Sequence, residues 1–533
     1  MKKILMPLAF ATAVIVGLWM GNRMNLGSQN SCLQTDEDSP IVRGNGGGEI
    51  EMLLNFIETV YVDTVDKKKL SEEAIVKIMS GLDPHSSYIP ADELQMVNDD
   101  LKGSFSGIGV QFNLQNDTIM VVSVISGGPS EKVGVQPGDR IVEVDDSAFV
   151  GKGITTEKVV KKLRGKKGTK VKIGVMRFGV DEVVHFTIKR DDIPTNSVEA
   201  FYMIEDGVGY VKVDKFGDNT DEEFFNALSS LKKMGANCFI VDLRGNSGGF
   251  LNTVTSMVNE FLEKDALIVY TEGKAFPREE SRAMGTGRFQ NDSIVVLIDE
   301  FSASASEIFA GAVQDNDRGM VIGRRSFGKG LVQNQFQLSN GSAIRLTIAR
   351  YYTPSGRCIQ KPYRDKEKYQ EEIYDRYKDG EMDSDTIGIK GDSVKYYTTK
   401  GRVVYGGGGI TPDYIVTRDT VGLTTYYTKL ISSGSIYDCA FRFLDERRKT
   451  ISSMSFDELC SYLDKQPLCD IAIDFAEKKG VKKDKEIRTE TRDHISKRMK
   501  ECIVRNAMGT EAYYKVVNQS DKMIDFTLKK LKR

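Results

Sequence analysis

A short apolar run gives way, within a few residues, to apolar side chains at helical spacing, and this switch constrains the fold most. Residues 293–298 (Ser-Ile-Val-Val-Leu-Ile) are rich in β-branched side chains and predict a buried strand. Ile308 and Ala312 then recur on one helix face, in a segment that runs to about residue 315. Strand and helix patterns alternate in the same way over residues 209–258, so we expect an α/β layered core.

Three serines, Ser302, Ser304 and Ser306, occupy the turn between this strand and helix. Backbone N–H groups are free at a helix start and the helix dipole favours negative charge, which suits an oxyanion. A structural alternative exists, because Ser302 or Ser304 could be an N-cap with Glu307 completing a capping box. The local sequence leaves the choice among the three serines open.

A lysine in a glycine-rich segment supplies the candidate base. Lys329 stands between Gly328 and Gly330, which let the backbone approach closely, and Gln333 follows four residues later. A lysine accepts a proton only when its amine is neutral, so its pKa must fall from about 10.4 through burial or nearby positive charge. The chain has three histidines, none near the serines in sequence: His85, His185 and His494. The pattern predicts a serine–lysine hydrolase, with the Gln333 amide orienting the amine.

A second glycine-rich turn follows the apolar run at residues 238–243. Its sequence is Arg-Gly-Asn-Ser-Gly-Gly, residues 244–249, and a helix pattern comes after it. Such a turn presents backbone N–H groups to an anion. It lacks the pattern of a phosphate-binding loop, so we read it as half of an oxyanion hole and not as a nucleotide site.

Together these motifs resemble those of the carboxyl-terminal processing (tail-specific) proteases. The resemblance covers roughly residues 50–415, and its motifs lie at residues 242–249, 302–308, 326–333 and 407–413. In that family the nucleophile is the middle serine of the Ser-Ala-Ser-Ala-Ser run, 25 positions before the lysine, which here is Ser304.

The resemblance also implies the supporting groups. It assigns the general base to Lys329 and the orienting amide to Gln333. The oxyanion donors would be the backbone N–H of Ala305 and that of one glycine in the pair Gly248 and Gly249. It implies a serine endopeptidase that needs no metal and no cofactor.

Residues 103–190 resemble a PDZ domain. Gly107, Ile108, Gly109 and Val110 match the loop that binds a peptide's terminal carboxylate through backbone N–H groups. A small β-barrel without a ligand is the alternative. A PDZ domain joined to a hydrolase core implies polypeptide substrates with free C-termini, cleaved near those termini.

The N-terminus predicts the location of the protein. Residues 1–21 carry two lysines before an apolar run and read as a signal peptide or signal anchor, with a linker at residues 22–48. No clear Ala-x-Ala cleavage site follows, which favours a retained anchor. We therefore expect an extracytoplasmic enzyme, in the bacterial periplasm, anchored to the inner membrane.

The expected organisation is a multi-domain α/β (α+β) protein. Residues 49–102 form a helical N-terminal segment, in which Asp83 and His85 are read as a structural turn and not as a catalytic pair. Residues 191–415 form a layered αββ-type protease core. Residues 416–533 form a helical extension, by default solvated, that could also dimerise or pack on the core.

Composition limits the partners. The chain has 533 residues and a net charge of −2, which gives no electrostatic case for nucleic acid. Seven cysteines without a CxxC pair argue against a metal site. The C-terminal region leaves room for one or two disulfides among Cys439, Cys460, Cys469 and Cys502. An adaptor protein and self-association stay open, and the rival functions are a ligand-binding relative without catalysis and a PDZ scaffold.

Overall fold

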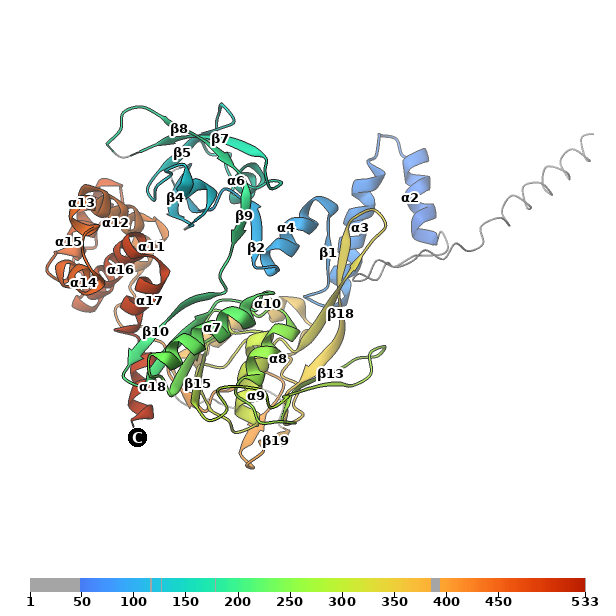
Figure 1. Ribbon diagram of the computed structural model, residues 1–533. Coiled ribbons are helices and arrows are strands. Elements are labelled where there is room, and N and C mark those ends of the chain that lie inside the picture. Colours follow the sequence, from blue (N-terminus) through green and yellow to red (C-terminus); the bar gives the residue numbers. More distant parts are fainter. Residues whose placement is uncertain (1–47, 116, 126, 178, 385–393, 533) are drawn as a thin grey trace, which may run out of the picture.

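The computed structural model describes residues 48–532, apart from 116, 126, 178 and 385–393 (Figure 1). The predicted signal or anchor segment at residues 1–21 and almost all of the predicted linker therefore lie outside the described residues. Within the described part, no helix is both long and apolar enough to cross a membrane.

A central sheet of six strands organises the core, in the order β10-β11-β12-β15-β16-β21. Neighbours from β11 to β21 run parallel, and β10 is antiparallel at one edge. Because β12 and β15 are parallel neighbours, the segments that follow them start at the same edge of the sheet. The strands are β10 (Val198–Glu205), β11 (Val208–Val213), β12 (Cys238–Asp242), β15 (Ser293–Ile298), β16 (Met320–Gly323) and β21 (Tyr414–Ile415).

The central sheet is buried on both faces. Phe239 and Val296 pack with helices α7 (Thr220–Lys233), α8 (Leu251–Asn259) and α9 (Ala305–Asp315) on one face. Ile240 and Leu297 point the other way and pack with α18 (Lys522–Leu531). Alternate residues along a strand face opposite sides, so one strand serves both cores.

A second sheet, of order β1-β18-β13-β14 with β17 paired to β18, lies on the far side of α9 (Figure 1). Every residue of α9 is buried. Strand β1 comes from the N-terminal segment, so this segment is part of the core sheet structure. The strands are β1 (Ser87–Ile89), β13 (Leu267–Glu272), β14 (Glu279–Arg282), β17 (Leu331–Gln337) and β18 (Ala343–Tyr352).

The predicted PDZ region forms a sheet of order β3-β4-β5-β7-β8, with β6 paired to β5. Strands β2 and β9 pair with each other where the chain enters and leaves this domain. Its elements are β2 (Ser104–Gly107), β3 (Val110–Gln115), β4 (Thr118–Val124), α5 (Pro129–Lys132), β5 (Arg140–Val144), β6 (Ser147–Ala148), α6 (Thr156–Leu163), β7 (Lys170–Met176), β8 (Val184–Lys189) and β9 (Asp191–Pro194).

The remaining segments before the C-terminal region are peripheral to these sheets. They are α2 (Glu49–Val60), α3 (Lys67–Leu82), α4 (Ala91–Leu101), α10 (Lys366–Lys378), a 3-10 turn η1 (Glu381–Asp383), β19 (Lys395–Tyr397) and β20 (Val403–Tyr405). The predicted class, a multi-domain protein of mixed helix and sheet with a helical C-terminal region, is confirmed. The exact domain boundaries stay predictions.

The C-terminal extension is a folded bundle, so the default expectation of a solvated helical tail was wrong. Phe441, Leu444, Leu459 and Leu463 are all buried. The last two helices reach the central sheet, and the first of them also packs in the bundle core (Figure 1). The helices are α11 (Thr425–Ser432), α12 (Ser435–Glu446), α13 (Arg448–Ile451), α14 (Phe456–Asp464), α15 (Leu468–Lys478), α16 (Thr489–Met508), α17 (Thr510–Asn518) and α18.

The cysteines of the bundle are free thiols, so the disulfides allowed by the sequence do not form. Six cysteines lie in the described residues and all six are unpaired. Four of them lie in or beside the bundle core: Cys439, Cys460, Cys469 and Cys502. Burial raises the pKa of Cys439 to about 12 and that of Cys502 to about 11. These residues act as small apolar core side chains.

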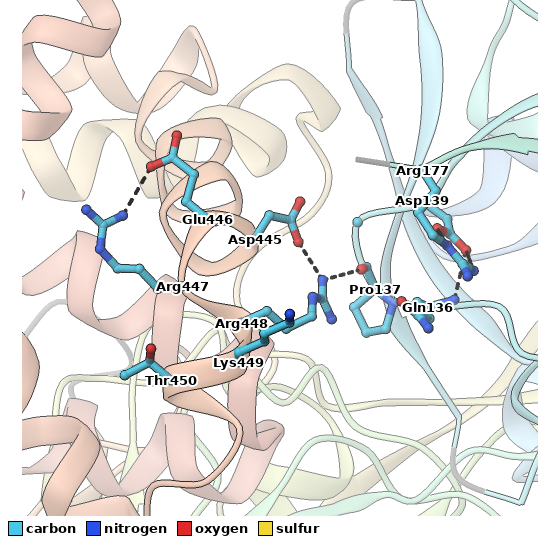
Figure 2. Close-up of a pocket in the computed structure, with 11 residues that line it drawn as sticks. Gln136, Pro137, Asp139, Arg177, Asp445, Glu446, Arg447, Arg448, Lys449 and Thr450 are labelled. Carbon is cyan, nitrogen blue, oxygen red and sulfur yellow. Dashed lines mark hydrogen bonds and ion pairs between the residues drawn. The ribbon is translucent and has the colours of Figure 1, made fainter. Parts of the chain in front are cut away.

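The bundle also touches the predicted PDZ region. Arg448 donates a hydrogen bond to the Pro137 carbonyl at 3.1 Å and pairs with Asp445 at 2.5 Å, as Figure 2 shows. A cavity of about 350 Å³ lies between the turn that holds Pro137 and the end of α12. The extension therefore contacts both the PDZ region and the core.

Packing of α18 on the central sheet predicts a large stability effect. Ile524 is 1% exposed against the sheet, whereas Ile431 in α11 is 41% exposed. We expect Ile524→Ala to lower the free energy of unfolding by about 2–5 kcal/mol and Ile431→Ala by less than about 1 kcal/mol, measured by urea denaturation. Equal effects would show that α18 is not packed on the sheet.

Candidate active site

Ser304 occupies the N-cap position of α9 in a strained backbone conformation. Its φ is 55° and its ψ is −115°, a region that residues other than glycine rarely adopt. Strain of this kind persists only where the surrounding structure holds it, and it is concentrated at functional sites. The N-cap alternative and the candidate nucleophile thus fall on the same residue.

The other two serines are structural. Ser302 and Ser306 are fully buried, and their hydroxyls donate to the Leu243 and Asn246 carbonyls, both at 2.9 Å. Ser304 is partly exposed. The local sequence left three candidates for the nucleophile, and their burial favours Ser304.

The glycine pair of the oxyanion turn (residues 244–249) packs directly against Ser304. A Cβ at Gly248 would lie 2.7 Å from the Ser304 Cβ, so only glycine fits there. The Gly248 N–H donates to Asn246 Oδ1 at 2.8 Å. Among the described residues no hydrogen bond uses the Gly249 N–H, and Ala305 is the first residue of α9, whose N–H has no acceptor within the helix. Gly249 and Ala305 are thus the available donors.

A buried carboxylate, Glu307, ties the serine segment to the lysine segment. Its Oε2 accepts the Ser304 N–H at 2.9 Å and the Lys329 N–H at 2.8 Å. Its Oε1 accepts the Gly328 N–H at 2.7 Å and the Ser326 hydroxyl. Burial raises the pKa of Glu307 to about 7, and these four donors oppose the rise by favouring the charged form. The sequence treated Glu307 only as a capping residue.

Tyr351 provides a second tie between the same two segments. Its hydroxyl lies 3.1 Å from the Ser304 carbonyl oxygen and also within hydrogen-bond distance of the Lys329 carbonyl oxygen. The side chain is 1% exposed and belongs to β18 of the second sheet. Sequence patterns assigned no role to Tyr351, because its partners are main-chain atoms that only the fold brings together.

The environment of Lys329 favours a neutral amine. Burial lowers the pKa of Lys329, and the positive charge of Arg345 lowers it further, while Glu307 and Asp83 act in the opposite direction. The net shift is downward, which is the direction that a general base requires.

Gln333 lies on β17 close behind Lys329, opposite Thr347 of β18. Its amide donates to Thr347 Oγ1 at 3.5 Å. The hydrogen bonds of the described residues do not include one between Gln333 and the Lys329 amine. The orienting role of Gln333 stays a prediction.

The turn at residues 82–88 lies beside the lysine. The Asp83 carboxylate accepts both the His85 and the Ser86 N–H groups, at 2.7 and 2.8 Å, so the residues form the structural turn that the sequence predicts. The Ser86 hydroxyl also contacts Thr347, the partner of Gln333. Burial and the charge of Lys329 lower the pKa of His85 to about 4. The position of this turn beside the base was not foreseen.

The motif at residues 407–413 supports the lysine segment from behind. The Ile410 N–H donates to Ser326 Oγ at 2.6 Å, and Arg325 donates to the Gly408 carbonyl at 2.5 Å. A Cβ at Gly409 would lie 2.7 Å from the Ser326 carbonyl oxygen, so this close approach requires glycine.

The predicted carboxylate-binding loop lies between β2 and β3. Gly107 ends β2, Val110 begins β3, and Gly109 has a φ of +77° that glycine adopts readily. Ile108 is buried. Strand β3 is at the edge of its sheet and pairs only with β4 among the described strands.

Comparison with known proteins finds three family matches along the chain. Residues 207–365 match peptidase family S41, residues 106–190 match the PDZ domain, and residues 426–509 match a family of unknown function, DUF8443. Among solved structures, the photosystem II D1 C-terminal processing protease is 26% identical with a TM-score of 0.33, over 57% of this chain and 88% of that one.

Curated relatives match at higher identity. The carboxy-terminal-processing protease of Bartonella bacilliformis is 38% identical over 313 residues, which are 57% of this chain and 70% of that protein. The carboxy-terminal processing protease CtpA of Bacillus subtilis is 35% identical over 306 residues, 57% of this chain and 65% of that protein. The chain belongs to the carboxy-terminal processing proteases, the serine peptidases of family S41 that carry a PDZ domain.

Proposed function

We propose that this protein is an endopeptidase with a Ser304–Lys329 dyad that cleaves polypeptides near their C-termini. The observation that carries the proposal is that two buried side chains each contact both the Ser304 segment and the Lys329 segment. Glu307 binds the N–H groups of Ser304 and Lys329, and Tyr351 contacts both of their carbonyl oxygens. A protein that only bound ligands would not need these two residues held together.

The first half of the reaction forms an acyl-enzyme. The neutral Lys329 amine takes the proton of Ser304 Oγ as that oxygen attacks the scissile carbonyl carbon. The carbonyl oxygen becomes an oxyanion, which the N–H groups of Ala305 and Gly249 stabilise. The Lys329 ammonium then gives its proton to the leaving amine, and the C–N bond breaks.

Water completes the cycle through the same groups. Lys329, neutral again, takes a proton from water as the water oxygen attacks the ester carbonyl. The second oxyanion occupies the same hole, and its collapse returns the proton to Ser304 Oγ. In this scheme Gln333 restricts the lysine side chain, and Gly248 leaves the space that Ser304 needs.

The PDZ domain would select the substrate. A peptide tail added to the free edge of β3 would place its carboxylate at the loop formed by Gly107, Ile108, Gly109 and Val110. The substrates are therefore polypeptides with free C-termini. The charged and apolar pattern of residues 1–21 supports an extracytoplasmic, membrane-anchored enzyme, in the bacterial periplasm at the inner membrane.

Substitution of the dyad tests the proposed activity. Ser304→Ala and Lys329→Ala should each lower kcat on an unfolded protein or a tail peptide by about 10⁴-fold or more, because each removes a group that takes part in bond making. Lys233→Ala, at the exposed end of α7, should behave as wild type. Cleavage by Ser304→Ala at the wild-type rate would favour a contaminating protease, and no cleavage by wild type would favour the ligand-binding or scaffold alternatives.

The pH profile tests the role of Lys329. Because the base acts as the neutral amine, kcat/KM should rise with pH and level off above an apparent pKa that lies below the ordinary lysine value of 10.5. Arg345→Gln removes a positive charge that lowers the Lys329 pKa, so the profile should move to higher pH and activity near pH 7 should fall. Arg350→Gln, on the same strand but exposed, is the matched control. A profile unmoved by Arg345→Gln would argue against Lys329 as the titrating base.

A further inference from the structure

We propose that Asp521, at the start of α18, is a positioning residue for the oxyanion turn, and that the C-terminal extension is therefore part of the catalytic unit. The inference rests on the proposed function, since it concerns the same turn. It gives a role to the C-terminal extension. The protease motifs do not reach this region, and residues 426–509 of it match a family of unknown function.

Asp521 performs two tasks with one carboxylate. Its Oδ1 accepts the N–H groups of Met523 and Ile524, at 2.8 and 3.1 Å, and so caps α18. Its Oδ2 accepts Arg244 Nη1 at 2.6 Å. Arg244 is the first residue of the oxyanion turn, so the last helix of the chain is joined directly to that turn.

Packing fixes the position of Asp521. The residues that follow it, Met523, Ile524 and Thr527, are buried at 3%, 1% and 0% exposure. Met523 and Ile524 share a core with Ile240 and Leu297 of the central sheet. The carboxylate is thus held by a helix that cannot shift without disturbing the sheet.

Asp521 binds the one terminal nitrogen of Arg244, Nη1, that Asp242 of the preceding strand does not bind. Asp242 accepts Arg244 Nε at 2.9 Å and Nη2 at 2.6 Å, which leaves Nη1 for Asp521. Burial would raise the pKa of Asp242, but the charges of Arg244 and Lys212 hold it at about 2, so this carboxylate is ionised. The Lys212 ammonium also donates to the Arg244 carbonyl. The charges of Asp242, Asp521, Arg244 and Lys212 therefore lie together at this end of the turn, and beside them the Asp299 carboxylate accepts the Gly245 N–H at 2.9 Å.

The main chain joins Arg244 to Asn246, and the hydrogen bonds of Asn246 hold the segments that carry the oxyanion donors. Asn246 lies two residues after Arg244 in the turn. Its carbonyl accepts the Ala303 N–H at 3.0 Å and the Ser306 hydroxyl at 2.9 Å, and these two donors flank Ser304 in the chain. The Asn246 side chain accepts the Gly248 N–H. A shift at Arg244 would therefore move the Gly249 N–H relative to Ser304, and oxyanion stabilisation depends steeply on the position of its donors.

Two substitutions at Asp521 separate its tasks. Asn is a good N-cap and keeps an acceptor for Met523 and Ile524 but loses the negative charge. Glu keeps the charge for Arg244 but is a poorer cap. Asp525→Asn is the matched control, because Asp525 lies on the same helix, is exposed and pairs only with Lys529 among the described residues. All variants are made as single substitutions in the full chain. Ser304→Ala is made as a separate control for loss of activity.

The readouts are kcat, KM and the thermal unfolding midpoint, with one tail peptide as substrate. Asp521→Asn should lower kcat by about tenfold, with KM and the unfolding midpoint equal to those of Asp525→Asn. Asp521→Glu should recover most of the wild-type kcat even if its unfolding midpoint falls.

Two outcomes overturn the inference. The first is a kcat of Asp521→Asn equal to or above that of Asp525→Asn. The second is a kcat that is lower in Asp521→Glu than in Asp521→Asn, because kcat would then follow the capping ability of the side chain and not its charge. If wild type is no faster than Ser304→Ala, the proposed function fails and the inference fails with it. If wild type is faster than Ser304→Ala but equal to Asp521→Asn, the inference alone fails.

Discussion

The buried carboxylate of Glu307 accepts hydrogen bonds from the serine segment and the lysine segment at once, and the geometry of the site depends on this interaction. Ser304 and Lys329 are 25 residues apart, the first at the N-cap of α9 and the second in the loop between β16 and β17. A carboxylate with four donors and no exposure to water has few alternative positions, so it fixes the two main-chain segments relative to each other. Tyr351 repeats the constraint through the carbonyl oxygens of the same two residues.

The layers of the fold explain why such a site can be rigid. Helix α9 lies between the two sheets with every residue buried, and Ser304 is at its first turn. The N-terminal segment adds β1 to the second sheet, and the C-terminal extension adds α18 to the outer face of the central sheet. Segments from both ends of the described chain therefore support one site in its middle. The oxyanion turn, joined to Asp521, is the clearest example.

Sequence patterns predicted the local elements well. The strands before the oxyanion turn and before Ser304, and the helices after them, follow from apolar periodicity, and the family match confirms the enzyme class. The patterns could not reveal Tyr351 or Asp521, because their partners are main-chain atoms or residues hundreds of positions away. The cysteine count suggested disulfides, but burial decides that question and a sequence does not show which helix faces are buried. The expectation of a solvated C-terminal extension was wrong for the same reason.

The rate at which a fluorophosphonate labels the protein, with the labelled serine mapped by mass spectrometry, tests the central claim most directly, since it reports serine reactivity without a requirement for tail binding. The variants to compare are wild type, Tyr351→Phe and Tyr352→Phe, the last being the neighbouring tyrosine, whose ring stacks on Tyr270. The account predicts labelling at Ser304, about tenfold slower in Tyr351→Phe and unchanged in Tyr352→Phe. Labelling of Ser302 or Ser306, or equal rates in all three proteins, would contradict it.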